Sequence, residues 1–230
     1  MKFNIWKREL EFNQETKIIT YKDKVFKPSI RTFGDMKELY NKWTIKDDYG
    51  LYYMYRDIYF DDDNKQLLRK NNIRYDITII LPKIISGEYN KTYWHYHPLN
   101  KKLRNYQELY QVLSWKAIYL QQNKNKAFFI EANTWNSVNM EEWFWHITIN
   151  PNKYDVLIMA NLVDDSFSSN YNEYKKNKWW MYYLYTNWWE TNEYYIEVPN
   201  LEEDNKLFPS DSGSIYDDFL KNPEKFNYLH

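Results

Sequence analysis

The segment Gly87-Glu88-Tyr89-Asn90-Lys91-Thr92-Tyr93-Trp94-His95-Tyr96-His97-Pro98 contains two of the chain's four histidines. His95 and His97 are separated by one residue, Tyr96, in an aromatic-rich run from Tyr89 to His97 that is typical of a β-strand. Alternate side chains of a strand lie on one face, so the two imidazoles would face the same way. Imidazole is a common metal ligand, and the pair therefore predicts a metal site, although a His-x-His pair alone often occurs by chance.

A carboxylate and a third histidine follow this pair in the chain. Glu108 precedes the strand-like run Leu109–Leu113, and His146 lies within the run Phe144–Ile149. Three imidazoles and one carboxylate suit iron, manganese, nickel or zinc. The chain has no cysteine, which excludes disulfides, thiol catalysis and cysteine-based zinc sites.

Short apolar runs separated by polar turns predict an all-β barrel or sandwich. Besides the runs already named, the expected strands are Lys17–Tyr21, Leu51–Tyr55, Tyr75–Leu81, Ala117–Gln121, Ala127–Ala132 and Val156–Leu162. Gly34–Lys42 is expected to be a short helix, and Asp61–Asp63 and Gln122–Lys126 are expected to be solvated turns.

The length and charge of the chain favour one domain without a polyanionic partner. At 230 residues, a single β domain over residues 1–200 with an N-terminal extension is expected, followed by a peripheral C-terminal tail over residues 201–230 with a short helix at Ile215–Leu220. Lys and Arg total 31 against 32 Asp and Glu, so no net field attracts nucleic acid or an anionic membrane. No window has the roughly 18 apolar residues of a membrane span, and a cytoplasmic protein is expected.

Three segments resemble, in order, the signature of the cupin-type, metal-dependent glucose-6-phosphate isomerases. They are Thr78–Pro82, Gly87–Pro98 and Glu108–Leu113, and the similarity can be followed from Tyr52 to Pro199. The family pattern is Thr-x-x-x-Pro, then Gly-x-Glu-Phe-x-Lys-Thr-x-Gly-His-x-His, then Pro-Glu-x-Tyr. The resemblance implies a cupin fold, which is a double-stranded β-helix or jelly-roll barrel, with short peripheral helices.

The resemblance also implies roles for individual residues. The metal ligands would be His95, His97, Glu108 and His146, with iron as the expected divalent metal and manganese, nickel or zinc as alternatives. The substrate-binding positions would be Tyr52, Thr78, Thr92 and the backbone of Trp94, and Tyr110 would line the pocket beside Glu108 as a second candidate catalytic residue. The family further implies a sugar-phosphate substrate and a homodimer, for which Tyr182, Tyr183, Tyr185, Tyr194 and Tyr195 are candidate interface residues.

The reaction implied is the interconversion of glucose 6-phosphate and fructose 6-phosphate. A metal that chelates the substrate oxygens would act as a Lewis acid, and Glu108 would be the base that moves a proton through an enediol. A hydride shift would leave Glu108 as a ligand only. Two other functions stay open: another metal-cupin enzyme, such as a dioxygenase or a different sugar-phosphate isomerase or epimerase, and a non-catalytic cupin that binds sugars on exposed tryptophans.

The composition contains an anomaly, with 4 glycines and 11 tryptophans. Average usage predicts about 16 glycines in a chain of this length. Asn187-Trp188-Trp189 lies between the strand-like runs Met181–Thr186 and Glu193–Val198, where a hairpin calls for glycine. Other tryptophans at apparent breaks or at family glycine positions are Trp43, Trp94, Trp115, Trp135, Trp143, Trp145, Trp179 and Trp180. One hypothesis is that the source reads the UGA codon as glycine; the alternative is a genuinely tryptophan-rich protein.

Overall fold

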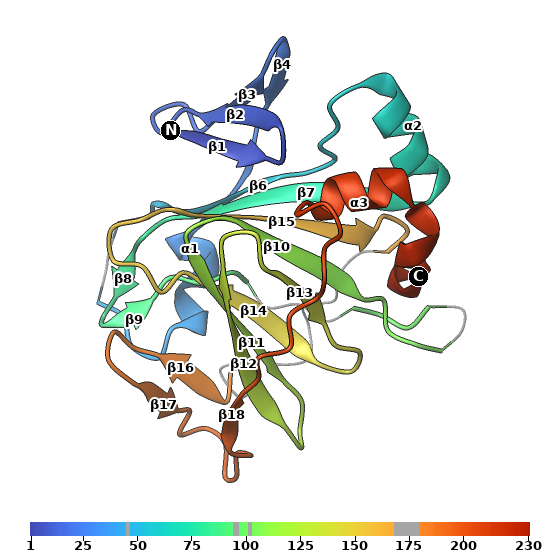
Figure 1. The fold of residues 1–230 in the computed structure, drawn as a ribbon. Coiled ribbons are helices and arrows are strands. Elements are labelled where there is room, and N and C mark those ends of the chain that lie inside the picture. Colours follow the sequence, from blue (N-terminus) through green and yellow to red (C-terminus); the bar gives the residue numbers. More distant parts are fainter. Residues whose placement is uncertain (45–46, 94–96, 101–102, 168–179) are drawn as a thin grey trace.

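The computed structural model describes residues 1–44, 47–93, 97–100, 103–167 and 180–230. Two β-sheets form its centre (Figure 1). The larger has the strand order β13(Ser137–Met140), β10(Glu108–Ser114), β15(Leu157–Asp164), β7(Ile73–Ile80), β6(Gly50–Tyr55), β5(Ser29–Thr32). The other has the order β14(Trp145–Ile149), β11(Lys116–Gln122), β12(Ala127–Asn133), β18(Leu201–Glu203).

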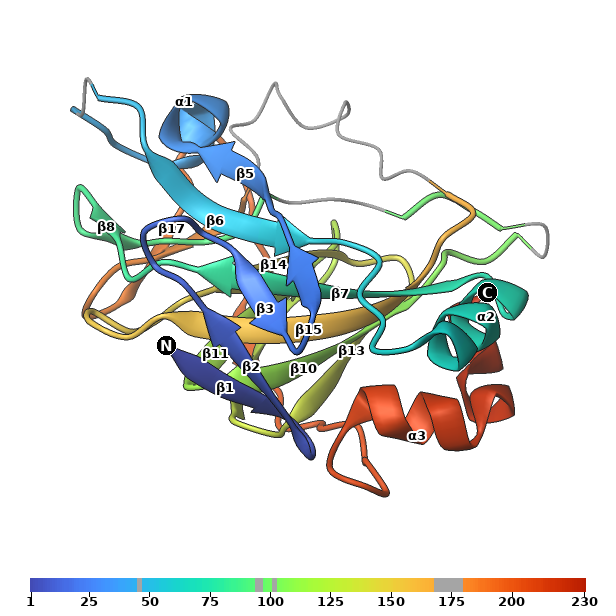
Figure 2. The same ribbon diagram turned by 90° about the horizontal axis from the view of Figure 1, so that it is seen from above.

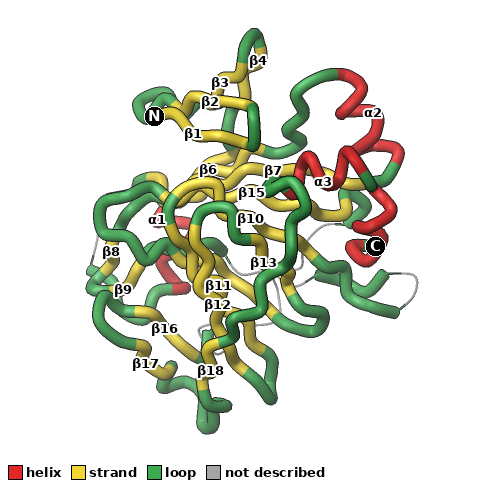
Figure 3. The backbone as a smooth tube through the Cα atoms, viewed as in Figure 1, coloured by secondary structure: helices red, strands yellow, loops and turns green. Residues whose placement is uncertain are grey.

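The remaining elements surround this pair of sheets (Figure 3). A separate sheet is formed by β1(Lys2–Ile5), β2(Arg8–Phe12), β3(Ile19–Tyr21) and β4(Lys24–Phe26), and two small hairpins by β8(Ile84–Ile85) with β9(Glu88–Tyr89) and β16(Tyr182–Leu184) with β17(Trp189–Thr191). The helices are α1(Phe33–Met36), α2(Asp62–Lys70) and α3(Ile215–Lys221), with 3-10 turns at Lys37–Leu39 and Pro223–Leu229.

Both faces of the six-stranded sheet are buried, and each face packs in a different core. On β15, Leu157 and Met159 point to the core shared with β11, β12 and β14, whereas Ile158 and Leu162 point to a second core on the opposite side. Burial on both faces explains why every residue of β15 is buried and why its sequence shows no alternation of apolar and polar residues.

The second core joins the two ends of the chain. The strands β1–β4 cover one part of the outer face of the six-stranded sheet, and α2 and α3 lie over another (Figures 1 and 2). Residues 201–230, expected to form a peripheral tail, contribute fully or almost fully buried side chains, among them Tyr216, Phe219 and Leu229. The final segment is therefore part of the packed structure.

Several local expectations need correction. Asp61–Asp63 is exposed to solvent, as expected, but it starts a helix in place of a turn: the Asp61 side chain accepts a hydrogen bond from the Asn64 N–H and caps α2, and acidic residues are favourable in the first turn of a helix. In the described part of the expected strand Tyr89–His97, which is residues 89–93 and His97, regular pairing ends at Tyr89, and Lys91 forms an isolated bridge with Ile149. The N-terminal segment forms four strands where one was expected.

Candidate metal centre and substrate cavity

The inner face of the six-stranded sheet borders a cavity of about 350 Å³. This volume is within the range of small-molecule sites. The residues that line it alternate along each strand: Tyr52 and Met54 of β6, Arg74, Asp76 and Thr78 of β7, Glu108 and Tyr110 of β10, and Met159, Asn161 and Val163 of β15. The lining also includes Arg31 of β5, Asp164 of β15 and, from connecting segments, Arg56, Thr92, Tyr93, His97 and Phe167. Period-2 geometry thus places polar groups from four neighbouring strands around one space.

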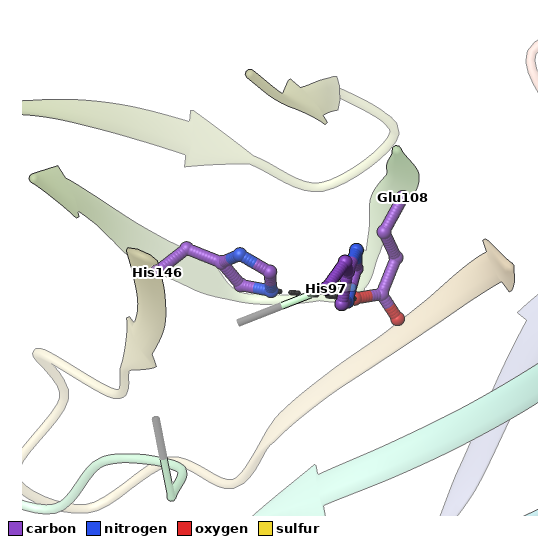
Figure 4. Close-up of side chains that lie close together, drawn as sticks. All are labelled: His97, Glu108 and His146. Atoms are coloured by element: carbon purple, nitrogen blue, oxygen red, sulfur yellow. Dashed lines mark hydrogen bonds and ion pairs between the residues drawn. The ribbon is translucent and has the colours of Figure 1, made fainter. Parts of the chain in front are cut away.

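Three potential metal ligands meet at one end of this cavity (Figure 4). One carboxylate oxygen of Glu108, Oε2, lies 3.3 Å from His97 Nε2 and 3.3 Å from His146 Nε2. The ligand atoms of the three residues all lie within 4.8 Å of one another, and all three residues are buried. They come from three different segments, with Glu108 on β10, His146 on β14 of the facing sheet and His97 in the connection before β10.

The His97 ring is oriented by a backbone group. Its Nδ1 lies 2.8 Å from the carbonyl oxygen of Tyr106, which can only accept, so Nδ1–H is the donor. This bond leaves Nε2 of the neutral ring with a lone pair directed at Glu108. Phe167 packs against the same imidazole with ring centroids 4.8 Å apart and stacks on Tyr106. Such a second hydrogen bond is the usual way in which a metal-binding histidine is held.

Glu108 is fixed through its other oxygen. Asn161 Nδ2 donates a 2.6 Å hydrogen bond to Oε1, and both side chains are buried. The two oxygens therefore have separate surroundings: Oε1 faces the amide, and Oε2 faces the two imidazoles. Asn161 thereby selects which oxygen faces the histidines.

The donor set fits a divalent cation. Nε2 of His97 presents a lone pair to a carboxylate oxygen inside a buried site, and a positive charge between these two atoms would remove their repulsion. Ligand distances of about 2.0–2.2 Å place neighbouring ligand atoms about 3 Å apart, which agrees with the two 3.3 Å separations. Two nitrogens and one oxygen suit a divalent transition metal, whose identity this ligand set does not determine.

Tyr110 lies beside Glu108 in the same wall and stays protonated at neutral pH. Burial raises its pKa well above the ordinary tyrosine value, and the negative charge of Glu108 and a hydrogen bond to it raise the pKa further. Its ring also packs near His146, with centroids 6.0 Å apart. A neutral phenol in this position can donate a hydrogen bond.

Three further hydroxyl-bearing residues, Tyr52, Thr78 and Thr92, line the same cavity. Thr92 pairs with Thr148 through its backbone N–H and through its Oγ1, which accepts from the Thr148 N–H at 3.0 Å. The Tyr52 hydroxyl accepts the Tyr93 N–H at 3.0 Å, and Thr78 lies two strands from Glu108 on the same inner face. These contacts hold Thr92 against β14 and Tyr93 against β6.

The structure thus brings together most of the residues singled out from the sequence. Tyr52, Thr78, Thr92, His97, Glu108 and Tyr110 line one cavity, and His146 contacts Glu108 from the facing sheet. His95 and Trp94 lie outside the described residues. Sequence reasoning missed Asn161, whose only signal is an amide within the apolar run of β15, and Asp76, whose pKa burial raises despite its contact with Arg74.

Comparison with known proteins places the chain in a family. The model of the family described as glucose-6-phosphate isomerase (GPI) matches residues 30–200. The chain belongs to this family. Within the GPI match lie all seven residues gathered around the cavity and its metal ligands, and the two facing sheets are the cupin barrel that the sequence predicted. A search of curated proteins finds no match.

Solved structures that resemble the chain share little sequence with it. Vicilin from Capsicum annuum is 10% identical with a TM-score of 0.36, over 52% of this chain and 29% of that one. Oxalate decarboxylase from Bacillus subtilis is 15% identical with a TM-score of 0.39, over 53% and 28%. Oxalate oxidase in complex with glycolate is 10% identical with a TM-score of 0.34, over 44% and 46%. The chain thus spans less than half of each.

None of the helices in the described part of the chain is long and apolar enough to cross a membrane. Tyr182, Tyr183 and Tyr185, expected at a dimer interface, are at most 8% exposed within the single chain, whereas Tyr194 is 47% exposed. Three of the five candidate interface tyrosines therefore belong to the chain's own core.

Proposed function

We propose that the protein interconverts glucose 6-phosphate and fructose 6-phosphate with a divalent metal bound by His97, Glu108 and His146. The observation that supports this most is the meeting of three buried ligand atoms at one end of a cavity that also contains two threonine hydroxyls, in a chain of the GPI family. His95 is proposed as the fourth ligand from the sequence motif, with iron as the first metal to test.

The metal and the protein would divide the chemistry between them. A divalent ion held there would act as a Lewis acid toward the oxygens on carbons 1 and 2 of the open-chain sugar. Glu108 is the proposed base: its carboxylate would take the proton from one of these carbons and return it to the other. Asn161 holds that carboxylate in one orientation, so the base needs little reorganisation.

The other cavity residues would bind and orient the substrate. Tyr110, kept neutral by burial and by Glu108, lines the cavity beside the proposed base, and its hydroxyl oxygen can accept a hydrogen bond from a sugar hydroxyl. Thr78, Thr92 and Tyr52 are proposed to face the phosphate end, as is the backbone at position 94. A homodimer and a cytoplasmic location remain predictions from the family resemblance and the sequence.

The test is isomerase activity of the metal-loaded protein. Fructose 6-phosphate is supplied with ferrous iron or manganese, and glucose 6-phosphate is followed with a coupled dehydrogenase. The chain is compared with a variant that carries Trp94→Gly, Trp115→Gly, Trp143→Gly and Trp145→Gly. Activity that a chelator abolishes and metal restores supports the proposal. Stoichiometric metal binding without turnover in either protein contradicts it, and incorporation of solvent deuterium at carbon 2 separates proton transfer from a hydride shift.

A further inference from the structure

Arg31 lies at the opposite end of the cavity from the metal ligands. It is on β5, directly opposite Tyr52 of β6, and both residues line the cavity. Four strand spacings separate β5 from β10, which carries Glu108. At about 4.8 Å each, they amount to roughly 19 Å along the sheet, and less across its curved inner face. Arg31 and Glu108 therefore lie on well-separated strands of the wall that borders the cavity.

The guanidinium of Arg31 is positioned by the residues around it. Its Cζ lies 5.2 Å from the centroid of the Tyr93 ring, a cation–π arrangement that orients the planar group. Tyr93 is itself tied to β6, because its N–H donates to the Tyr52 hydroxyl. Thr92, the preceding residue, also lines the cavity. The guanidinium of Arg31 and the hydroxyls of Tyr52 and Thr92 thus lie around one part of the cavity wall.

Charges along the cavity differ from end to end. The described carboxylates that line it are on β7, β10 and β15, and each contacts a basic group there: Asp76 with Arg74, Glu108 with the two imidazoles, and Asp164 with His230 at 2.6 Å. The part of the described wall formed by β5, β6 and Arg56, which directly follows β6, contributes the guanidinium groups of Arg31 and Arg56 and no carboxylate. This end favours an anionic group.

We propose that Arg31 binds the phosphate of the substrate and makes the site selective for phosphorylated sugars. The guanidinium presents parallel N–H donors that match two phosphate oxygens, which a lysine cannot do. The proposal rests on the proposed function in one respect only, since it assumes that the reacting end of the sugar lies at Glu108. The anion site itself can be tested without turnover.

The variants are Arg31→Met and Arg31→Lys, with Arg69→Met as the control. Arg69 is an exposed arginine of α2 that pairs with Asp57 and does not line the cavity. Binding of inorganic phosphate is measured by calorimetry, metal affinity by chelator competition, and KM and kcat with fructose 6-phosphate. Arg31→Met is expected to weaken phosphate binding and raise KM by about 10- to 100-fold, the effect of losing hydrogen bonds to a charged group.

Metal affinity is expected to stay unchanged in Arg31→Met, and Arg31→Lys is expected to recover only part of the phosphate affinity. Unchanged phosphate binding and KM in Arg31→Met would overturn the proposal. If the wild-type chain binds phosphate through Arg31 but isomerises no sugar phosphate, the anion site is supported and the isomerase proposal fails. If Arg31→Met does not fold, phosphate binding and KM are compared between the wild type and Arg31→Lys, and unchanged values would overturn the proposal.

A second inference rests on the backbone at the tryptophans. Trp6, Trp115, Trp135 and Trp143 have φ angles of 53°, 70°, 73° and 68°. Gly87 and Gly213 have φ angles of 93° and 83°, in the same left-handed region. Left-handed backbone is a genuine outlier for a bulky side chain, and glycine adopts it without a steric penalty.

These four tryptophans lie between paired strands or just before a strand, and their side chains are 38–50% exposed. Trp115, for example, links β10 to β11. Trp135 lies in the connection between β12 and β13, and its N–H donates to the carbonyl of Val112 on β10. Trp180 is different, with 1% exposure in the core. Trp188, in the turn that first suggested glycine, is outside the left-handed region, as are Trp43 and Trp189.

We infer that the natural protein has glycine at positions 6, 115, 135 and 143, through UGA codons translated as glycine in the source. Mass spectrometry of protein purified from that source is the direct test. Peptides lighter by the difference between tryptophan and glycine are expected at all four positions, and tryptophan masses there would overturn the inference. Trp115→Gly and Trp143→Gly are also expected to raise Tm by a few degrees, whereas Trp189→Gly within β17 lowers it.

Discussion

Replacing Asn161 by leucine isolates the effect of orienting Glu108. The substitution keeps a side chain of similar volume on β15 but removes the 2.6 Å hydrogen bond to Oε1. Because Glu108 and residue 161 are each 4% exposed, water cannot easily take the place of the lost donor. The carboxylate is left to rotate, and Oε2 is no longer held toward His97 and His146.

The expected size of the effect follows from that bond. A hydrogen bond to a charged group contributes about 1.5–3 kcal/mol. If the bond contributes this energy to holding Glu108 in its metal-binding orientation, its loss lowers metal affinity by about 10- to 100-fold. A loss of this size is also usual when a residue that hydrogen-bonds to a metal ligand is replaced. We expect the loss to appear in metal binding first and in turnover only through it.

Metal affinity can be measured without any activity, by competition between the protein and a fluorescent chelator for manganese or zinc. Asn150→Leu is the matched control. Asn150 is another buried asparagine, whose Nδ2 donates to the carbonyls of Ile80 and Asp155, away from the ligands. It should lower the free energy of unfolding while the folded protein keeps its metal affinity. A folded Asn161→Leu protein with wild-type affinity would refute the reasoning.

Three other perturbations test separate parts of the structure. Glu108→Gln removes the anionic ligand and proposed base, and kcat in the coupled assay should fall by at least about 100-fold. Lys91→Met leaves the buried carboxylate of Glu88 without its ion pair, so urea unfolding should show a loss of about 3–5 kcal/mol, largely recovered in the double variant with Glu88→Gln. Burial raises the pKa of Asp76, so its contribution to stability is present below the ordinary carboxyl pKa and is lost as pH rises through the raised value. In Asp76→Asn, Tm should therefore fall less than in the wild type as pH rises. The same dependence of Tm on pH in both proteins would contradict this expectation.

The strands could be predicted where residue pattern alone determines them. The runs behind β6, β10, β11, β12 and β15 are rich in β-branched and aromatic residues, and their expected bounds lie within a few residues of the observed ones. The residue pattern does not show which part of the structure packs against each face of a strand. Because β7 and β15 are buried on both sides, their sequences do not distinguish the face that lines the cavity from the face that packs on β1–β4 and α3.

The site was predictable to a different extent at each residue. His97, Glu108 and His146 stand out because few residue types bind metals and the chain has only four histidines. Asn161 and Arg31 do not stand out, because amides and arginines are common and their significance depends on neighbours far away in the sequence. Asn161 lies 53 residues from Glu108, and Arg31 reaches the cavity only through the pairing of β5 with β6.

The residues outside the family match explain how the barrel can hold so many polar groups. Residues 1–29 and 201–230 lie beyond the GPI match, yet Phe12, Tyr216 and Phe219 are fully buried against the outer face of the six-stranded sheet. Burial of apolar surface on that face stabilises the strands by about 25 cal/mol per Å². The inner face of the same strands therefore need not be apolar throughout, and it can carry Glu108 and Asn161. The two ends of the chain thus stabilise the sheet from the side opposite the chemistry, which is why the site can be polar and buried at once.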